Sequence, residues 1–449
     1  MRPLWVLNCV GLVRAHLGSA TPALSRLAGR GRVLDLEPAL PAVTTTVQTT
    51  LLTGQDPSRH GIVGNGWYFR ELGEVWLWRQ SEGLVQAPPW WAATGRPKVL
   101  KHFWWYAMNS AATAVVTPRP AYHHDGRKSP DCYAWPPELK SELGRRHGTF
   151  PLFSFWGPGA GIASTRWIAQ SFLTAVEVAR PDIALCYLPH LDYDLQRFGP
   201  TGPHLERNLR DLDAAVAPIL AAAESEGARV AVVSEYGIGA VDRAVFPNRL
   251  LRDAGFLAVQ RNATGELLDA PMSRAFAVVD HQALHAYVRD PDDVPAVAAL
   301  LRSCTGVAEV YAGDERRQVG LDHPRSGEVV AFADHGCWFA HDWWLDPRDA
   351  PDFARCVEIH KKPGYDPREL AFDPVGGKRR AAVALLRKKL GFRYTLDCIG
   401  MDPSVVRGSH GRRPRPEERP LLIVPGDGPA ITHQREAAGL LAAVAAEGG

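Results

Sequence analysis

The sequence lacks any run of about twenty consecutive apolar residues, so we expect no membrane-spanning helix. Its apolar start, "LWVLNCV", is interrupted by Asn8 and Cys9, and no clear cleavage site for a secretion signal follows. We interpret this segment as a first buried strand, Leu4 to Val10, and a cytoplasmic location is the default expectation.

Cysteine pairs and an excess of charge are also missing. The seven cysteines are scattered and form no C-x-x-C pair, which argues against a disulfide framework and against a cysteine zinc site. The 51 basic and 49 acidic residues nearly cancel. A general nucleic-acid-binding protein usually has a basic excess on one face, so we expect no nucleic-acid partner.

The 449 residues fit two or so domains, or one large domain with insertions. Short apolar strands alternate with helical segments in residues 1–245, a pattern typical of an α/β fold with a mainly parallel central sheet flanked by helices. We read residues 246–400 as an inserted α+β cap, and residues 401–449 as the completion of the core with a C-terminal helix. "RPLLIVPG" is expected to return to the same sheet, and the C-terminal helix to be peripheral.

Polar side chains follow three of the predicted strands. Asn8 lies near the end of the first, Asp192 and Asp194 follow "DIALCYL", and Glu235 and Tyr236 follow "ARVAVVS". Ligands of open α/β sheets gather at the carboxyl ends of the strands. We therefore expect these side chains to contribute to one site.

Six threonines occur among the ten residues Thr44–Thr53, and the glycine-rich "HGIVGNG" follows. A threonine hydroxyl attacks well only when a metal ion or a base activates it. The amide of Asn65 could donate to a phosphoryl oxygen, and the glycines allow a ligand to approach the backbone closely. The alternative is a threonine-rich strand followed by a glycine turn, without chemistry.

The stretch "PAVTTTVQTTLLTGQDPSRHGIVGN" resembles the nucleophile segment of the type I phosphodiesterase/nucleotide pyrophosphatase family, in the alkaline phosphatase superfamily. Thr44 stands nine residues before Thr53, "PSRHGI" follows, and Asn65 falls on the phosphate-binding asparagine. "HLDYDLQRFGP", "VVSEYG" and "RGSHG" resemble later family motifs in the family's order. The resemblance implies an alkaline-phosphatase-like core and hydrolysis of a phosphoester or pyrophosphate by Thr44, assisted by Asn65.

The resemblance also implies a divalent metal site, because the family binds two ions, usually zinc, through six side chains besides the threonine. Asp192 and His410 match that pattern, and Glu235 is a conservative change, so these three are the predicted ligands. Val10, Gln196 and Tyr236 stand where the family has the other ligands, and Val10 cannot ligate. The more oxygen-rich set would shift the preference from zinc toward manganese or magnesium.

Three interpretations stay open. The chain is a hydrolase with a rebuilt metal site, or Thr44 acts without metal beside cations from "IHKKPG" or "GSHGRR". The third is a non-catalytic or biosynthetic ligand-binding protein with a vestigial site.

The remaining candidate site residues come from the same motifs and from the cap. Asn8, Asp194, Gln196 and Tyr236 are candidates for a secondary or substrate role, and His281 and His360 could join the site from the cap. Trp67 closely follows Asn65, so aromatic rings are expected to wall the pocket. Such walls suit a small phosphorylated substrate with an aromatic or apolar moiety.

Overall fold

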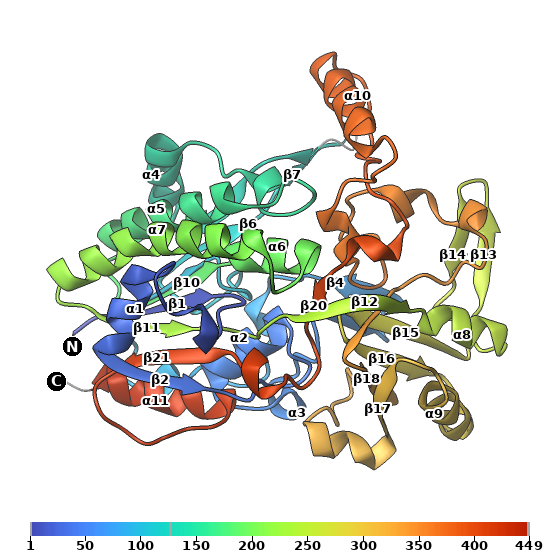
Figure 1. Cartoon of the computed structure of the whole chain (residues 1–449), viewed down its shortest axis with the longest axis horizontal. Coiled ribbons are helices and arrows are strands. Elements are labelled where there is room, and N and C mark those ends of the chain that lie inside the picture. The colour runs from blue at the N-terminus through green and yellow to red at the C-terminus, as the bar shows by residue number, and fades with distance from the viewer. Residues whose placement is uncertain (1, 125–127, 447–449) are drawn as a thin grey trace.

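The computed structural model describes residues 2–124 and 128–446, and an eight-stranded sheet forms its centre (Figure 1). In spatial order its strands are β2 (Gly31–Asp35), β21 (Leu421–Pro425), β11 (Arg229–Val233), β1 (Leu4–Cys9), β10 (Ile183–Leu188), β5 (Val99–His102), β6 (Ala114–Pro118) and β9 (Cys132–Trp135). The five strands from β11 to β6 are mutually parallel, and β21 and β9 pair antiparallel with the two ends of this group. The predicted α/β class with a mainly parallel sheet is confirmed, as is the return of "RPLLIVPG" to that sheet.

Strand β1 explains why the sheet is covered on both faces. All six of its residues are buried, and successive side chains point to opposite faces. Leu4 and Val6 belong to one apolar cluster, whereas Trp5 and Leu7 belong to another. A parallel sheet buried on both faces requires this continuous apolar sequence.

Helices form the two outer layers (Figure 1). One layer contains α1 (Pro22–Gly29), α4 (Pro137–His147), α5 (Ile162–Ala179), α6 (His190–Phe198) and α7 (Pro203–Ser225). The other contains α2 (Thr44–Thr53), α3 (Pro57–His60) and α11 (Gln434–Ala446). Leu440, Leu441 and Val444 of α11 are buried in the same cluster as Val47 and Leu51 of α2, so the C-terminal helix is part of the core rather than peripheral.

A second sheet of four antiparallel strands lies in the segment expected as the cap. Its order is β15 (Ala275–Asp280), β16 (Ala283–Val288), β18 (Val329–Ala333) and β17 (Val307–Ala312), and α8 (Pro247–Asp253) and α9 (Val294–Arg302) pack beside it. This segment mixes helices and antiparallel strands as expected for an α+β insertion. The boundaries at residues 245 and 400 stay a prediction.

The remaining strands form small two- and three-stranded sheets between and around the two larger sheets. They are β3 (Gly66–Phe69) with β4 (Glu74–Leu77), β7 (Ala121–Tyr122) with β8 (Lys128–Ser129), β13 (Val259–Asn262) with β14 (Gly265–Leu268), and β12 (Gly239–Val245) between β19 (Gly336–Phe339) and β20 (Gly408–Ser409). Helix α10 (Gly377–Lys389) projects from the body at the top of the view, on the side away from the second sheet (Figure 1). Among the described helices, none combines the length and the apolarity needed to cross a membrane.

Candidate active site

The threonine-rich segment forms a buried helix, α2, and not the strand considered as an alternative. Thr45 Oγ1 donates to the carbonyl of Gly64 at 2.7 Å, and Thr46 Oγ1 donates to that of Ile62 at 3.1 Å. Gly54 ends the helix in the left-handed region, with a φ of 66°. The threonines therefore tie the glycine-rich loop to the first turn of α2, where Thr44 stands.

Thr44 is the first residue of α2, and its side chain lines a large cavity. Its Oγ1 lies 3.1 Å from the hydroxyl of Tyr236, and that hydroxyl lies 3.3 Å from Asp192 Oδ1. The three groups thus form one hydrogen-bonded row, and all of them line the cavity. This row links the predicted nucleophile to a carboxyl group.

Asn65 is held next to Thr44 on two sides. Its Oδ1 accepts from the backbone N–H of Thr45 at 3.0 Å, and its Nδ2 donates to Asp280 Oδ1 at 3.1 Å. Asp280 Oδ2 also accepts from the Asn65 backbone at 2.8 Å. Burial raises the pKa of Asp280 to about 6. Asp280 could not be predicted as the anchor of Asn65, because the two residues are 215 positions apart along the chain.

Asp192 and Asp194 lie on helix α6 and not on a continuing strand. Residues two apart on a helix point in different directions. Gln196, one turn after Asp192, donates to Asp192 Oδ2 at 2.8 Å. Asp194 instead pairs with Arg197 at 2.9 Å and accepts from Asn208 at 3.0 Å. Asp192 and Gln196 therefore face the site, whereas Asp194 ties α6 to α7.

Glu235 follows β11 and is fully buried beside Thr44's helix. Its Oε1 accepts from Asn8 Nδ2 at 2.6 Å and from Gln48 Nε2 at 2.7 Å. Burial raises the pKa of Glu235 to about 8, and these two amide hydrogen bonds offset only part of that effect. Burial likewise raises the pKa of Asp192 to about 7, against the hydrogen bonds from Gln196 and Tyr236. The hydrogen bonds that these two carboxyl groups accept thus come from neutral donors.

Four rings stack in a column beside Thr44. Tyr236 and His410 are nearly parallel with centroids 3.5 Å apart, His410 and His281 are 3.8 Å apart, and His281 and Tyr365 are 3.6 Å apart. His410 Nδ1 donates to the carbonyl of Ala42 at 2.7 Å, so its Nε2 carries the lone pair. Burial holds the pKa of both histidines well below the ordinary value, which keeps the rings neutral. Tyr365, which also donates to Gln196 Oε1 at 3.1 Å, was missed by the sequence analysis.

The residues present do not fit the two-ion centre of the resembling family. Within residues 2–124 and 128–446, no three His, Cys, Asp or Glu side chains lie close enough together to hold one ion. His410 Nε2 lies 3.8 Å from Asp192 Oδ1, but the latter already accepts from Tyr236, and Glu235 Oε1 accepts from two amides. His410 Nε2 and Glu235 Oε2 have no hydrogen-bond partner among the described residues, but each residue would supply only one atom to coordinate a metal ion.

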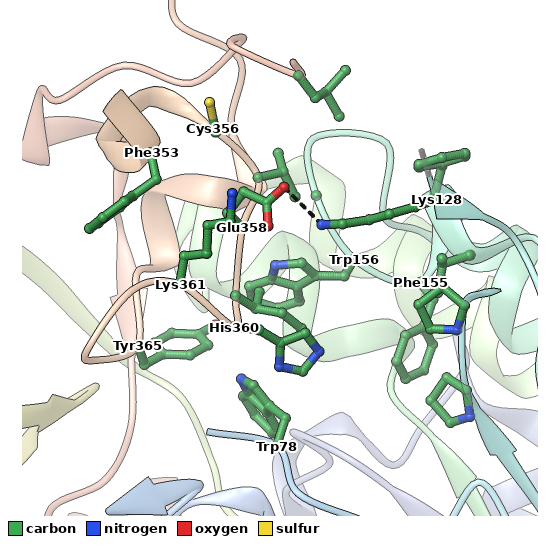
Figure 2. Close-up of a pocket in the computed structure, with 18 of the residues that line it drawn as sticks. Trp78, Lys128, Phe155, Trp156, Phe353, Cys356, Glu358, His360, Lys361 and Tyr365 are labelled. Atoms are coloured by element: carbon green, nitrogen blue, oxygen red, sulfur yellow. Dashed lines mark ion pairs between the residues drawn. The ribbon is translucent and has the colours of Figure 1, made fainter. Parts of the chain in front are cut away.

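A cavity of about 1860 Å³ opens above Thr44, well beyond the roughly 300–1,000 Å³ of a typical small-ligand pocket. Trp78, Trp156 and Tyr365 gather on one wall beside His360, as Figure 2 shows. The expected aromatic wall is therefore present. Trp67 does not line it: this residue is buried against Phe69, with the Arg325 guanidinium over its ring.

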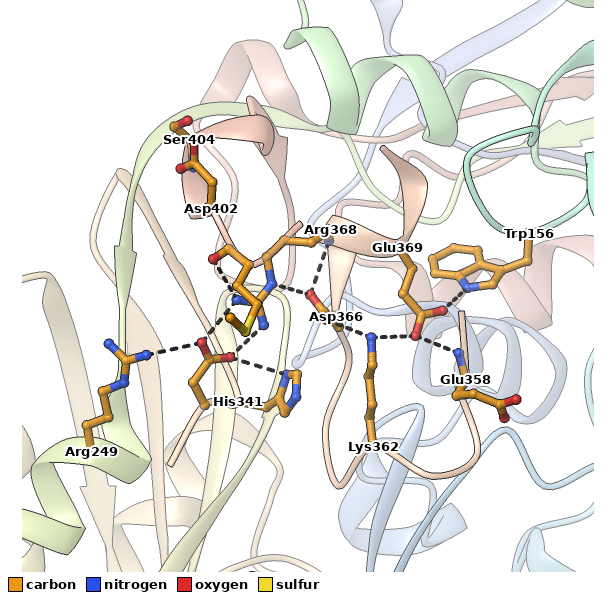
Figure 3. A network of polar contacts seen from close by, with 12 residues as sticks. Trp156, Arg249, His341, Glu358, Lys362, Asp366, Arg368, Glu369, Asp402 and Ser404 are labelled. Atoms are coloured by element: carbon orange, nitrogen blue, oxygen red, sulfur yellow. Dashed lines mark hydrogen bonds and ion pairs between the residues drawn. The ribbon is translucent and has the colours of Figure 1, made fainter. Parts of the chain in front are cut away.

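A buried network of charges fixes the loop that carries His360 and Tyr365 (Figure 3). Arg368 contacts Asp342 at 2.5 Å and Asp366 at 2.7 Å. Lys362 contacts Asp366 at 2.8 Å and Glu369 at 2.7 Å. Glu369 also accepts from the indole N–H of Trp156 at 2.7 Å. The loop is thus connected directly to the aromatic wall.

Comparisons with known proteins agree with this fold. The chain is 16% identical to phosphonoacetate hydrolase from Sinorhizobium meliloti 1021, solved in complex with phosphonoacetate, with a TM-score of 0.62 over 99% of this chain and 96% of that one. Murine ectonucleotide pyrophosphatase/phosphodiesterase 5 is 14% identical, with a TM-score of 0.58 over 99% and 95% of the chains. At these identities the likeness shows the fold alone.

Sequence comparison identifies the family of the chain. An uncharacterized pyrophosphatase/phosphodiesterase of Schizosaccharomyces pombe is 25% identical over 201 residues, which are 44% of this chain and 36% of the yeast protein. The chain thus matches about a third of that relative's length. The profile of the family described as type I phosphodiesterase / nucleotide pyrophosphatase matches residues 5–366. The chain therefore belongs to the type I phosphodiesterase/nucleotide pyrophosphatase family.

Proposed function

We propose that the chain hydrolyses a phosphoester or pyrophosphate by attack of Thr44 on phosphorus. The row from Thr44 Oγ1 through Tyr236 to Asp192 at the cavity floor carries the proposal. A hydroxyl becomes a useful nucleophile when its proton has an acceptor within hydrogen-bond reach. Family membership supports the reaction class.

The first step forms the bond between Thr44 Oγ1 and phosphorus and breaks the bond from phosphorus to the leaving oxygen. The Thr44 proton passes to the Tyr236 oxygen as the Tyr236 proton passes to Asp192 Oδ1. The leaving oxygen takes up a proton from solvent. Water then attacks phosphorus and the bond from phosphorus to Thr44 Oγ1 breaks, while Asp192 returns its proton to Tyr236 as Tyr236 protonates Thr44 Oγ1, which completes the hydrolysis. Asn65 has a second amide hydrogen beyond the one given to Asp280, and the N-terminus of α2 favours negative charge. The amide hydrogen and the helix N-terminus would both stabilise negative charge on the phosphoryl oxygens.

The cavity suggests the substrate class. Around Thr44 it is lined by phenols, the carboxyl group of Asp192 and the neutral imidazole of His281, and its walls are aromatic. We propose a small phosphorylated molecule whose aromatic or apolar part occupies the space beside Trp78, Trp156 and Tyr365. The prediction of a divalent ion at Asp192, Glu235 and His410 is separate from this mechanism. Metal analysis of protein purified without chelator tests it.

Hydrolysis of bis-p-nitrophenyl phosphate, with and without added Zn, Mn or Mg, tests the nucleophile. Thr44→Ala is expected to lose nearly all turnover, Thr44→Ser to retain part of it, and Tyr236→Phe to be slower by roughly a hundredfold or more. Acid quenching of wild type should trap a p-nitrophenyl phosphoryl group on the peptide that contains residue 44. Equal turnover by wild type and Thr44→Ala would refute the role of this hydroxyl.

A ligand-binding protein with a vestigial site is the second candidate. It is favoured by the donors of Asp192 and Glu235, which are neutral amides and a phenol where catalysis of phosphoryl transfer commonly uses cations. Under this candidate a phosphorylated aromatic compound raises the unfolding temperature of wild type and of Thr44→Ala equally, without turnover by either.

A further inference from the structure

Helix α10 and the residues that follow it carry charge of one sign. Between Pro374 and Leu396 the chain has seven lysines and arginines and no aspartate or glutamate. Lys378, Arg379 and Lys389 are exposed to solvent. Such a block differs from the rest of the chain, in which the two signs nearly cancel.

The same helix exposes large apolar side chains. Val383, Leu386 and Leu390 are three and four residues apart, so they share one face, and all three are more than half exposed. Phe392, just beyond the helix, is 59% exposed. The helix stands clear of the body (Figure 1), so no described element covers this face. Arg379, one turn before Val383, shares this face, so basic and apolar side chains are interleaved on it. Such a surface suits the boundary between lipid headgroups and acyl chains, where long basic side chains can reach the headgroups while their apolar neighbours are buried.

The surface is continuous with the cavity of the proposed active site. Leu385 of α10 and Tyr394 after it line that cavity, and Leu385 is also half exposed. The Lys388 ammonium lies 5.1 Å from the ring of Phe153, another lining residue. Whatever covers α10 therefore borders the cavity entrance.

We propose that α10 with residues 390–393 binds the surface of an anionic lipid bilayer. Val383, Leu386, Leu390 and Phe392 would enter the boundary between headgroups and acyl chains, and the lysines and arginines would pair with anionic headgroups. A second copy is disfavoured as the occupant, because two basic faces repel each other. Nucleic acid is disfavoured because its phosphates give the apolar side chains nothing to bury against. This binding does not depend on the proposed hydrolysis.

Sedimentation with vesicles tests the proposal. The full chain is expected to sediment with vesicles that mix phosphatidylglycerol and phosphatidylcholine, and much less with pure phosphatidylcholine. Each basic charge removed near such a surface weakens binding roughly fivefold, so the triple variant K378Q/R379Q/K389Q should bind roughly a hundredfold more weakly. The triple variant R26Q/R59Q/K98Q, which removes three exposed charges on other elements, is the matched control and should bind as wild type does.

The apolar contribution has its own matched pair. Leu390 and Met272 are each 63% exposed, the first on the proposed surface and the second in a turn after β14. Leu390→Asp should abolish sedimentation with anionic vesicles, whereas Met272→Asp should leave it unchanged. Equal binding by wild type and the α10 triple variant would overturn the proposal. So would a chain that ignores both vesicle types but self-associates through Leu390, which would identify a second copy as the occupant. Vesicle binding is measured without substrate, so a failure to bind vesicles does not affect the proposed role of Thr44. Loss of that role likewise would not affect the membrane proposal.

Discussion

Two buried groups of acidic side chains in this molecule are neutralised in opposite ways. Asp366 lies between Arg368 and Lys362, whereas Asp192 and Glu235 accept hydrogen bonds from amides and a phenol. Burial alone would raise the pKa of Asp366, but the two cations lower it well below its usual range. Burial raises the pKa of Asp192 to about 7 and that of Glu235 to about 8. For Asp366 the cationic partners outweigh burial, whereas for Asp192 and Glu235 the neutral partners do not.

This contrast separates a structural role from a chemical one. The cationic partners of Asp366 lock the loop that carries Tyr365, and they leave that acid no tendency to take a proton at neutral pH. Asp192 faces the cavity with a pKa near neutrality, which suits a group that accepts a proton from Tyr236. Perturbed carboxyl groups that line a cavity are candidates for function, whereas paired ones are usually structural.

The largest expected effect comes from removing one partner in the charged network. Arg368→Met leaves Asp342 and Asp366 buried without their shared cation, and it should lower the free energy of unfolding by about 3–5 kcal/mol. Urea unfolding followed by tryptophan fluorescence measures this. Arg355→Met is the control, because Arg355 is half exposed and 3.9 Å from Asp373. A loss below about 1 kcal/mol for Arg368→Met would contradict the structural role assigned to the network.

The second expected effect is a pH dependence of stability. Glu235 has an ordinary pKa of 4.5 and a folded-state pKa of about 8, so the folded chain keeps a proton that the unfolded chain releases. Its contribution to stability is therefore present at low pH and is lost as pH rises from about 4.5 to 8. Glu235→Gln should remove this slope. Unfolding of wild type and variant between these pH values, both in the presence of a chelator, gives the comparison.

The outcome distinguishes the two groups of acids. If the two chains lose stability in parallel as pH rises, Glu235 is not protonated in the folded state. Asp366 should behave in the opposite sense, because its lowered pKa means that its contribution is lost only as pH falls below the ordinary value of 3.8.

The fold was largely predictable from the sequence, because its signals are local. Strands such as Leu4–Cys9 are continuous apolar runs, and a parallel sheet buried on both faces demands them. The position of Thr44 was predictable too, since the family motif around it is contiguous. The alternative of a threonine-rich strand was wrong. β-Branched residues favour strands, but here the segment is helical and two of its threonine hydroxyls donate to carbonyls in the loop at residues 61–65.

The composition of the site was less predictable, because its contacts are long-range. Asp280 holds Asn65 across 215 positions, and Tyr365 reaches Gln196 across 169. Nothing near Asn65 or Gln196 in the sequence indicates these partners. Helix α6, which begins directly after β10, also affects which acids reach the site. It directs Asp192 and Asp194 to different sides, whereas a continuing strand would have placed both on one face.

The smallest expected effect concerns an ion pair at the edge of the cavity. Lys128 Nζ lies 2.8 Å from Glu358 Oε1 (Figure 2), nearly the same distance as the buried pair of Lys362 and Asp366. Its side chains are 30% and 22% exposed, against 1% for each member of the buried pair. Water and salt screen the exposed pair, and holding two long side chains costs entropy, so Lys128→Met should change the unfolding free energy by less than about 1 kcal/mol. The difference between Lys128→Met and wild type should shrink further at high salt. A loss as large as that of Arg368→Met, and independent of salt, would show that burial of the charges is not what separates the two pairs.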